Sequence, residues 1–273
     1  MSHAIHVALR EVKIGFRNPW AYSFMALFTV FSLALLLIQA QNVVRGYSAA
    51  TGTMLSLILY LLPLMTLLLG SFSLTAEKEE GSWQLLSTYP MSTFSFISGK
   101  YAGLAVVLLT IVAFGFGVTG LLGAIAGQSF DAGTYALFLV FSAGLILLFL
   151  AVALGIGTIA GNRWQALTYA VAIWFFAIIG WQALLIAGLG MLPYMWIKPA
   201  VTVLTFLNPA ELVRLFVVVK LGGGAVLGPE YYNWVQWIRE PSGTWAFVGI
   251  CLVWIVISIG LANQIWERGR ARG

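Results

Sequence analysis

The sequence predicts an all-α polytopic membrane protein with six transmembrane helices, an N-terminal amphipathic interfacial helix, and short outer-face helices between spans five and six. Composition is the first reason, because 61% of the 273 residues are hydrophobic and only 8% are charged. A soluble globule of this length needs more polar surface than that. The second reason is that six apolar runs reach the ~20 residues that cross about 30 Å of hydrocarbon. No repeat or linker divides the chain, so we expect one integral membrane domain over residues 1–273.

Residues 1–19 are expected to form a basic amphipathic helix on the cytosolic face. Apolar residues recur there every three or four positions, and basic residues do the same on another face: Ile5, Leu9, Val12 and Phe16 against Arg10, Lys13 and Arg17. Asn18-Pro19 would end this helix before the first span. A cleaved signal peptide is the alternative, but the apolar run is long and Leu37-Ile38-Gln39-Ala40 lacks a small residue three positions before its final alanine.

The six apolar runs lie near Trp20–Ile38, Thr53–Leu74, Tyr101–Ala126, Thr134–Ala160, Ala166–Leu189 and Thr244–Ile265. None of the runs contains Asp, Glu, Lys, Arg or His, the residues that mark ion and proton pathways in membranes. We therefore expect no ion-driven transport. Basic residues gather in the segments that face the cytosol if the N-terminus does, and the short outer loops hold only Arg45. This asymmetry predicts a multi-pass protein of the cytoplasmic (inner) membrane with both termini cytosolic.

The long stretch 191–243 needs a separate interpretation, because Pro199–Leu221 is apolar enough to suggest a seventh span. A seventh crossing would place the basic C-terminal tail outside, against the charge asymmetry, so we assign 191–243 to the outer face. Two short helices broken at Asn208-Pro209 and dipping into the membrane edge would fit. An ordinary interfacial amphipathic helix would fit as well, and the sequence leaves both open.

The most informative feature is a polar island, residues 75–100, between the second and third spans. It contains a charged run followed by an aromatic and apolar one: Glu77, Lys78, Glu79, Glu80, Gly81, Ser82, Trp83, Gln84 and Leu85. Such an island on the cytosolic face of an apolar protein indicates a docking site for a soluble partner. The alternative is that Trp83 lies at the headgroup level and the acidic residues are simply solvated.

Catalytic residues, metal sites and cofactors are not expected. His3 and His6 lie on the N-terminal helix, and Cys251 is the lone cysteine. Gly99-Lys100 lacks the leading glycine of a phosphate-binding loop and is followed by Tyr101, so any ATP must be bound by another chain. The net charge of +5 is explained by the cytosolic basic residues, and no nucleic-acid partner is expected.

These features together resemble the membrane subunits, or permeases, of ABC-2-type exporters over essentially the whole chain. The resemblance rests on the six spans, the basic N-terminal helix, the Glu-Lys-Glu-Glu-Gly-Ser run with Leu85-Leu86-Ser87 and Pro90, and Gly99-Lys100. It implies a coupling helix that enters a groove on an ABC ATPase subunit, built here from Glu79, Glu80, Gly81, Ser82, Trp83, Gln84 and Leu85. It implies a second, smaller contact at the turn between spans four and five, Asn162, Arg163 and Trp164. It also implies a homodimer or, alternatively, a pair of this subunit with a homologue, and ATPase activity only in the partner chain.

Within this family, the segment Asn208-Pro209-Ala210-Glu211-Leu212-Val213-Arg214-Leu215 looks most like the NosY-type permeases, which accompany maturation of copper enzymes such as nitrous-oxide reductase. This likeness implies an outer-face motif of Asn208, Pro209, Glu211 and Arg214, and an outer-face (periplasmic) accessory protein as a further partner. Few Cys and His lie along the spans, so a bare copper ion is not the expected cargo.

Two other functions fit parts of this sequence pattern. A passive membrane anchor or assembly factor could present the same island, and a bound ATPase that turns over would distinguish a transporter from it. An intramembrane enzyme would need a base, a nucleophile pair or a metal. The spans offer only hydroxyl and amide side chains, and we expect no acid or base near them: Thr110, Ser142, Thr158, Gln182 and Ser258. Three glycine pairs spaced four apart indicate close helix packing within the chain or, alternatively, a dimer seam: Gly99/Gly103, Gly123/Gly127 and Gly157/Gly161.

Overall fold

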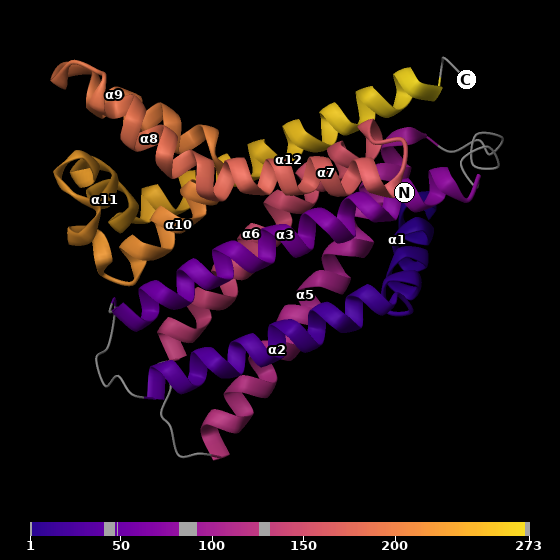
Figure 1. Ribbon diagram of the computed structural model, residues 1–273, viewed down its shortest axis with the longest axis horizontal. Helices are drawn as coiled ribbons and strands as arrows, with labels where there is room; N and C mark the ends of the chain where they lie inside the picture. The colour runs from indigo at the N-terminus through magenta and orange to yellow at the C-terminus, as the bar shows by residue number, and fades with distance from the viewer. Residues whose placement is uncertain (1, 41–46, 48, 82–91, 126–131, 271–273) are drawn as a thin grey trace.

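The computed structural model describes residues 2–40, 47, 49–81, 92–125 and 132–270, and the regular structure of these residues is helical throughout, as predicted. Figure 1 shows long helices that run side by side. The elements are α1 (Ser2–Gly15), α2 (Pro19–Ala40), α3 (Ala49–Glu79), α5 (Thr93–Ile125), α6 (Ala132–Ile159), α7 (Arg163–Phe175), the π-helix η1 (Phe176–Gly180), α8 (Trp181–Gly190), α9 (Tyr194–Leu207), α10 (Pro209–Lys220), the 3-10 helices η2 (Gly223–Leu227) and η3 (Pro229–Tyr231), α11 (Tyr232–Arg239) and α12 (Pro241–Arg270).

Five helical stretches of the described chain are long and apolar enough to cross a membrane: Thr51–Glu79, Thr93–Ile125, Ala132–Ile159, Arg163–Gly190 and Pro241–Arg268. They contain the second to sixth apolar runs of the sequence. The first run lies in α2, whose described apolar part, Pro19–Ala34, is shorter than these five. Helices α9 and α10 would supply one more span if the bent pair were counted as a single crossing.

Helices α3 and α5 extend beyond the apolar runs that predicted them, and these extensions carry charge. Helix α3 continues past Leu74 to Glu79, and α5 begins at Thr93, before Tyr101. Lys100 therefore lies inside a helix and is fully buried, and Glu77 is nearly so. The apolar runs contain no Asp, Glu, Lys, Arg or His, but the helices that continue them do. Charges can be packed there because each has an opposite partner, since an unpaired buried charge would be very costly.

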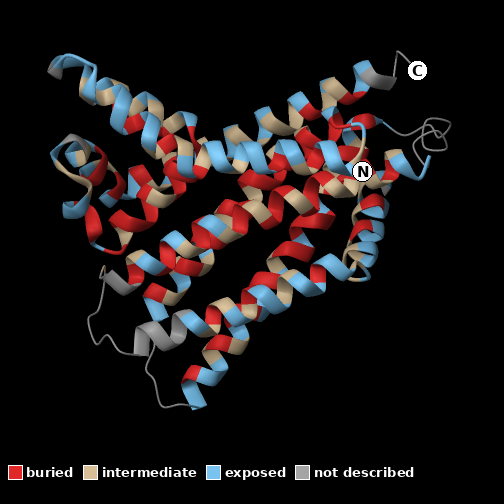
Figure 2. Ribbon diagram, in the orientation of Figure 1, coloured by how far each residue is buried: buried red, intermediate tan, exposed pale blue. Residues whose placement is uncertain are grey.

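Helix α6 lies at the centre of the fold, where it contacts α3, α5, α10 and α12. Buried residues concentrate on the inner helices in Figure 2, whereas much of α7, α8 and α9 is exposed. Close packing of α3 on α6 depends on small residues. A Cβ on Gly157 would lie 2.8 Å from the Cβ of Leu74, and one on Gly70 would lie 2.6 Å from the Cβ of Ala153. Gly157 thus serves packing within the chain.

The two ends of the helix bundle differ in what they hold (Figure 1). Helix α1, the last turn of α3 and the C-terminal end of α12 lie at one end, which we call the terminal end. Helices α9, α10 and α11 lie at the opposite end. Helix α1 and the last turn of α3 are therefore separated from α9, α10 and α11 by the length of the bundle.

The stretch 191–243 folds into several short helices, and the break at Asn208 shapes it. Helices α9 and α10 meet there at 108°. The Asn208 side chain caps α10 by accepting the N–H of Ala210 at 2.9 Å, and Pro209 occupies the first helical turn. Residues 199–221 are therefore two helices at an angle rather than one continuous interfacial helix.

Candidate coupling site at the terminal end

The last turn of α3 contacts several helices through three consecutive side chains. Lys78 reaches the C-terminal end of α6, where its Nζ donates to the carbonyl oxygens of Thr158 at 2.8 Å and Ala160 at 2.7 Å. The final carbonyls of a helix lack intrahelical donors and carry partial negative charge, so a lysine is a favourable partner for them. The same ammonium lies 5.2 Å from the ring centre of Trp266 in α12.

Glu79 reaches the opposite way, to the start of α7. Its carboxylate accepts the backbone N–H of Arg163 at 2.8 Å and pairs with the Arg163 guanidinium at 3.0 Å. Asn162 caps α7 by accepting the N–H of Gln165 at 2.9 Å. The pair is partly exposed, so it contributes only about 0–1 kcal/mol to stability. Its importance is geometric, because it joins the polar island to the turn between α6 and α7.

The residues beside this pair face outward. Glu80 lies 3.7 Å from Arg163 and remains exposed. Gly81 ends α3 in the left-handed region with φ of 68°, a conformation that favours glycine. The Trp164 side chain is 78% exposed. The family resemblance implied that both segments are contact sites, and the structure brings Glu79, Glu80, Asn162, Arg163 and Trp164 together. Ser82, Trp83, Gln84 and Leu85 lie outside the described residues, so their role stays a prediction.

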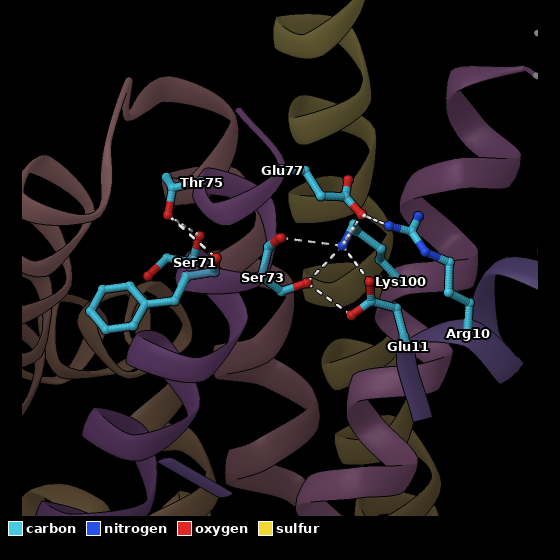
Figure 3. A network of polar contacts seen from close by, with 8 residues as sticks. Arg10, Glu11, Ser71, Ser73, Thr75, Glu77 and Lys100 are labelled. Atoms are coloured by element: carbon cyan, nitrogen blue, oxygen red, sulfur yellow. Dashed lines mark hydrogen bonds and ion pairs between the residues drawn. The ribbon is translucent and has the colours of Figure 1, made fainter. Parts of the chain in front are cut away.

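Glu77, the third side chain of this turn, belongs to a buried charge network that the sequence did not reveal (Figure 3). The Nζ of Lys100 lies 2.5 Å from Oε1 of Glu11 and 3.1 Å from Oε1 of Glu77. It also donates to Oγ of Ser73 at 2.7 Å, and that hydroxyl donates to Oε2 of Glu11 at 2.9 Å. Arg10 completes the network at 3.1 Å from Glu77. Two acids and two bases from α1, α3 and α5 thus balance each other.

Close contact between α1 and α5 makes this network possible. A Cβ on Gly99 would lie 2.6 Å from the carbonyl oxygen of Ala4, and one on Gly103 would lie 2.6 Å from that of Ala8. The glycine pair that could have marked a dimer seam therefore accommodates the N-terminal helix. The sequence contained one signal of this network: Glu11 is a carboxylate between apolar residues on the inner face of α1. Helical periodicity does not identify the residue that pairs with it.

A second polar group lies at the opposite end, around the predicted outer-face motif. Glu211 is buried and accepts from Nε of Arg214 at 2.9 Å, from Nη2 of Arg214 at 2.6 Å and from Nε2 of Gln182 at 2.9 Å. Asn208 donates to the carbonyl oxygen of Ala177 in the π-helix at 2.6 Å. The expectation that no charged group lies near the polar residues of the spans is wrong for Gln182, which contacts Glu211, and for Thr158, whose carbonyl binds Lys78.

The described residues contain no group of three or more His, Cys, Asp and Glu side chains arranged to hold a metal ion. Polar groups instead gather at both ends of a bundle of apolar helices, and they bind helix ends and one another. Fold and site together define a multi-span membrane protein whose helices are tied by charge at their ends.

Comparison with known proteins narrows this class. A family model described as ABC-2 family transporter protein matches residues 5–269, and the chain belongs to this family. Two relatives carry the name Probable ABC transporter permease protein NosY. The protein of Stutzerimonas stutzeri is 30% identical over 125 residues, 44% of this chain and 45% of its own length. The protein of Pseudomonas aeruginosa is 30% identical over 119 residues, 42% of this chain and 43% of its own. The matches span less than half of either relative. The family resemblance predicted from the sequence is confirmed.

Proposed function

We propose that this chain is the transmembrane subunit of an ABC exporter, which couples ATP hydrolysis by a separate ABC ATPase subunit to movement of a cargo across the cytoplasmic membrane. The observation that carries the proposal is the contact between Glu79 and Arg163. It unites the two segments to which the family resemblance assigns ATPase contact. Exposed Trp164 and Glu80 beside this contact supply an aromatic anchor and negative charge for a docking surface.

The contacts of the last α3 turn support a coupling mechanism. Through Glu77, Lys78 and Glu79 this turn binds α1 and α5, the end of α6 and the start of α7. A displacement of the segment that follows α3 would therefore act on several helices at once. Packed helices shift as units between discrete arrangements, so a displacement at this end can be transmitted to the far end of the bundle. ATP-driven closure of the ATPase subunits would cause that displacement.

The arrangement of the chain ends supports the proposed topology. Helix α1 and the end of α12 lie at the same end of the bundle, which requires an even number of crossings (Figure 1). We assign α2 as the first span, α9 to α11 to the outer face, and both termini to the cytosol. Residues 1–273 form one permease domain in this assignment. Two copies would pair around the transport path.

Maturation of a copper enzyme such as nitrous-oxide reductase is the process we assign to this transporter. Its support is the similarity to two NosY permeases and the Asn208–Leu215 segment that suggested them. In the structure this segment holds the ion pair between buried Glu211 and partly exposed Arg214. The exposed surface around α9 to α11 would then receive a periplasmic accessory protein.

Purification from the native host tests the function directly. We expect the tagged protein, extracted in mild detergent, to retain an ATPase subunit that hydrolyses ATP. Trp83→Ala and Trp164→Ala should each reduce the amount of ATPase retained. Trp245→Ala is the matched control, because Trp245 is 77% exposed and lies at the start of α12, far from the proposed contact. A clean preparation with no ATPase would contradict the proposal and favour a passive anchor.

A further inference from the structure

Helix α1 has one face packed on the bundle and another left open. Val7 and Glu11 are buried against α5. The side away from α5 carries Ile5, Leu9 and Lys13, spaced four apart along the helix, and Arg17 follows in the turn after it. We treat these four residues as one strip. Ile5 and Leu9 are 58% and 64% exposed, and Lys13 and Arg17 are also exposed. The strip is thus apolar in its first half and cationic in its second.

The two cations of this strip are not neutralised by the described part of the protein. The nearby carboxylates of Glu11 and Glu77 are bound to Lys100 and Arg10. Among the ion pairs of the described residues, none involves Lys13 or Arg17. These charges therefore remain available to an anion outside the chain.

The surroundings of the strip favour a lipid surface as that anion. An interfacial helix inserts apolar side chains at the headgroup level and places Lys and Arg among the headgroups. Exposed Trp20 and Tyr22, just after α1, are residues typical of this depth in the membrane. Helix α1 also turns steeply away from α2, so that it crosses the end of the span instead of continuing it (Figure 1).

We propose that the Ile5–Arg17 strip binds anionic phospholipid headgroups, and that the buried charges behind it make ATP turnover by the transporter depend on membrane charge. The binding step stands alone, whereas the dependence of turnover rests on the proposed function. The physical link is Arg10 and Glu11, which are adjacent to the strip and bind Glu77 and Lys100. A shift of α1 therefore acts on the same α3 turn that holds α6 and α7.

The lipid step is tested on the permease alone. In a Cys251→Ala background, Leu9→Cys carries an environment-sensitive fluorophore, and the protein is placed in phosphatidylcholine nanodiscs with increasing phosphatidylglycerol. We expect the emission to shift to shorter wavelength as phosphatidylglycerol rises. Lys13→Gln and Arg17→Gln should each raise the phosphatidylglycerol needed for half the shift by roughly fivefold. Arg239→Gln, at the opposite end, is the control and should leave it unchanged.

Two outcomes would overturn the lipid assignment. If the emission does not change as phosphatidylglycerol rises, the strip does not bind anionic headgroups. A response in neutral nanodiscs to glycerol phosphate or inorganic phosphate would make it a site for soluble anions.

The coupling step is tested on the complex with its ATPase. Turnover should rise with phosphatidylglycerol, and Arg10→Gln should abolish this rise while the fluorophore of the permease still responds. If ATP turnover by the unmodified complex does not change with phosphatidylglycerol, the coupling step alone is overturned. If no ATPase is recovered at all, the proposed function fails, and the emission shift still decides the lipid step.

Discussion

Lys100 and Glu11 form a buried ion pair across 89 positions of the chain, with Nζ 2.5 Å from Oε1. The pair ties the N-terminal helix to the start of a membrane span. Glu77 shares the same ammonium at 3.1 Å, so the lysine holds two acids from two other helices. Removing either the lysine or an acid should destabilise the protein, because the remaining charge would stay unpaired in a low-dielectric interior.

Lys100→Met should destabilise the protein strongly, because Glu11 would lose its ammonium partner while remaining buried. Loss of one partner from a buried pair typically costs about 3–5 kcal/mol. Thermal unfolding of the purified protein in detergent measures the effect. Lys13→Met is the matched control, because Lys13 is exposed, and it should unfold as the unmodified protein does. Lys100→Met with Glu11→Leu should recover part of the loss. Equal stability of Lys100→Met and the unmodified protein would show that the network carries no stability.

Gly103→Ala should separate α1 from α5, because its Cβ would meet the Ala8 carbonyl oxygen and the Glu11 Cβ, each at 2.6 Å. Overpacking of this kind costs about 1–3 kcal/mol. Gly117→Ala in the same helix is the control, because nothing lies within 4 Å of the new Cβ. It should be neutral or stabilise by up to about 1 kcal/mol through helix propensity. Unfolding midpoints compare the two, and the same midpoint in both variants would refute the close contact.

Glu79→Arg should weaken retention of the ATPase with little effect on folding, because the Glu79 and Arg163 pair is partly exposed. We expect a stability change within about 1 kcal/mol. The double variant Glu79→Arg with Arg163→Glu restores opposite charges and should regain much of the retained ATPase activity. Co-purification and ATP turnover are the measurements. If the double variant is no better than the single one, the pairing does not position the docking surface.

Asn208→Asp should lower the stability of the protein to unfolding, although asparagine and aspartate have nearly the same shape. The aspartate can still cap α10, but it cannot donate to the carbonyl oxygen of Ala177. Leaving that acceptor without its donor costs about 1–3 kcal/mol. Asn162→Asp is the matched control, because the side chain of Asn162 only accepts, from the N–H of Gln165, and aspartate does so equally well. Thermal unfolding should separate the two variants, and a tolerated Asn208→Asp would argue against the Ala177 contact.

Apolar runs predicted most of the helices in this fold, because a span needs a fixed length of hydrocarbon-compatible sequence. Helix α1 was predicted from periodicity, and the break at Asn208 from Asn-Pro chemistry. Helix ends were less well predicted, since charged residues such as Glu77 and Lys100 continue the helices beyond the hydrophobic segment.

The long-range pairs of the site were not predictable from the sequence. Periodicity assigns Glu11 to a face of its helix, but a contact with Lys100 depends on how two helices pack. Gln182 and Glu211 meet for the same reason. The π-helix was also missed, because Phe-Ala-Ile-Ile-Gly has no residue that distinguishes it from an ordinary helical turn.

That π-helix has a geometric consequence for the helix it interrupts. One extra residue per turn rotates everything after it by roughly 100° relative to an uninterrupted α-helix. Gln182, two residues after the π-helix, donates to Glu211 in this rotated register, and Asn208 donates to the Ala177 carbonyl oxygen within the π-helix. The facing direction of α8 is therefore held by Glu211 and Asn208, which lie outside it, and without the extra residue a different face of α8 would turn toward α10.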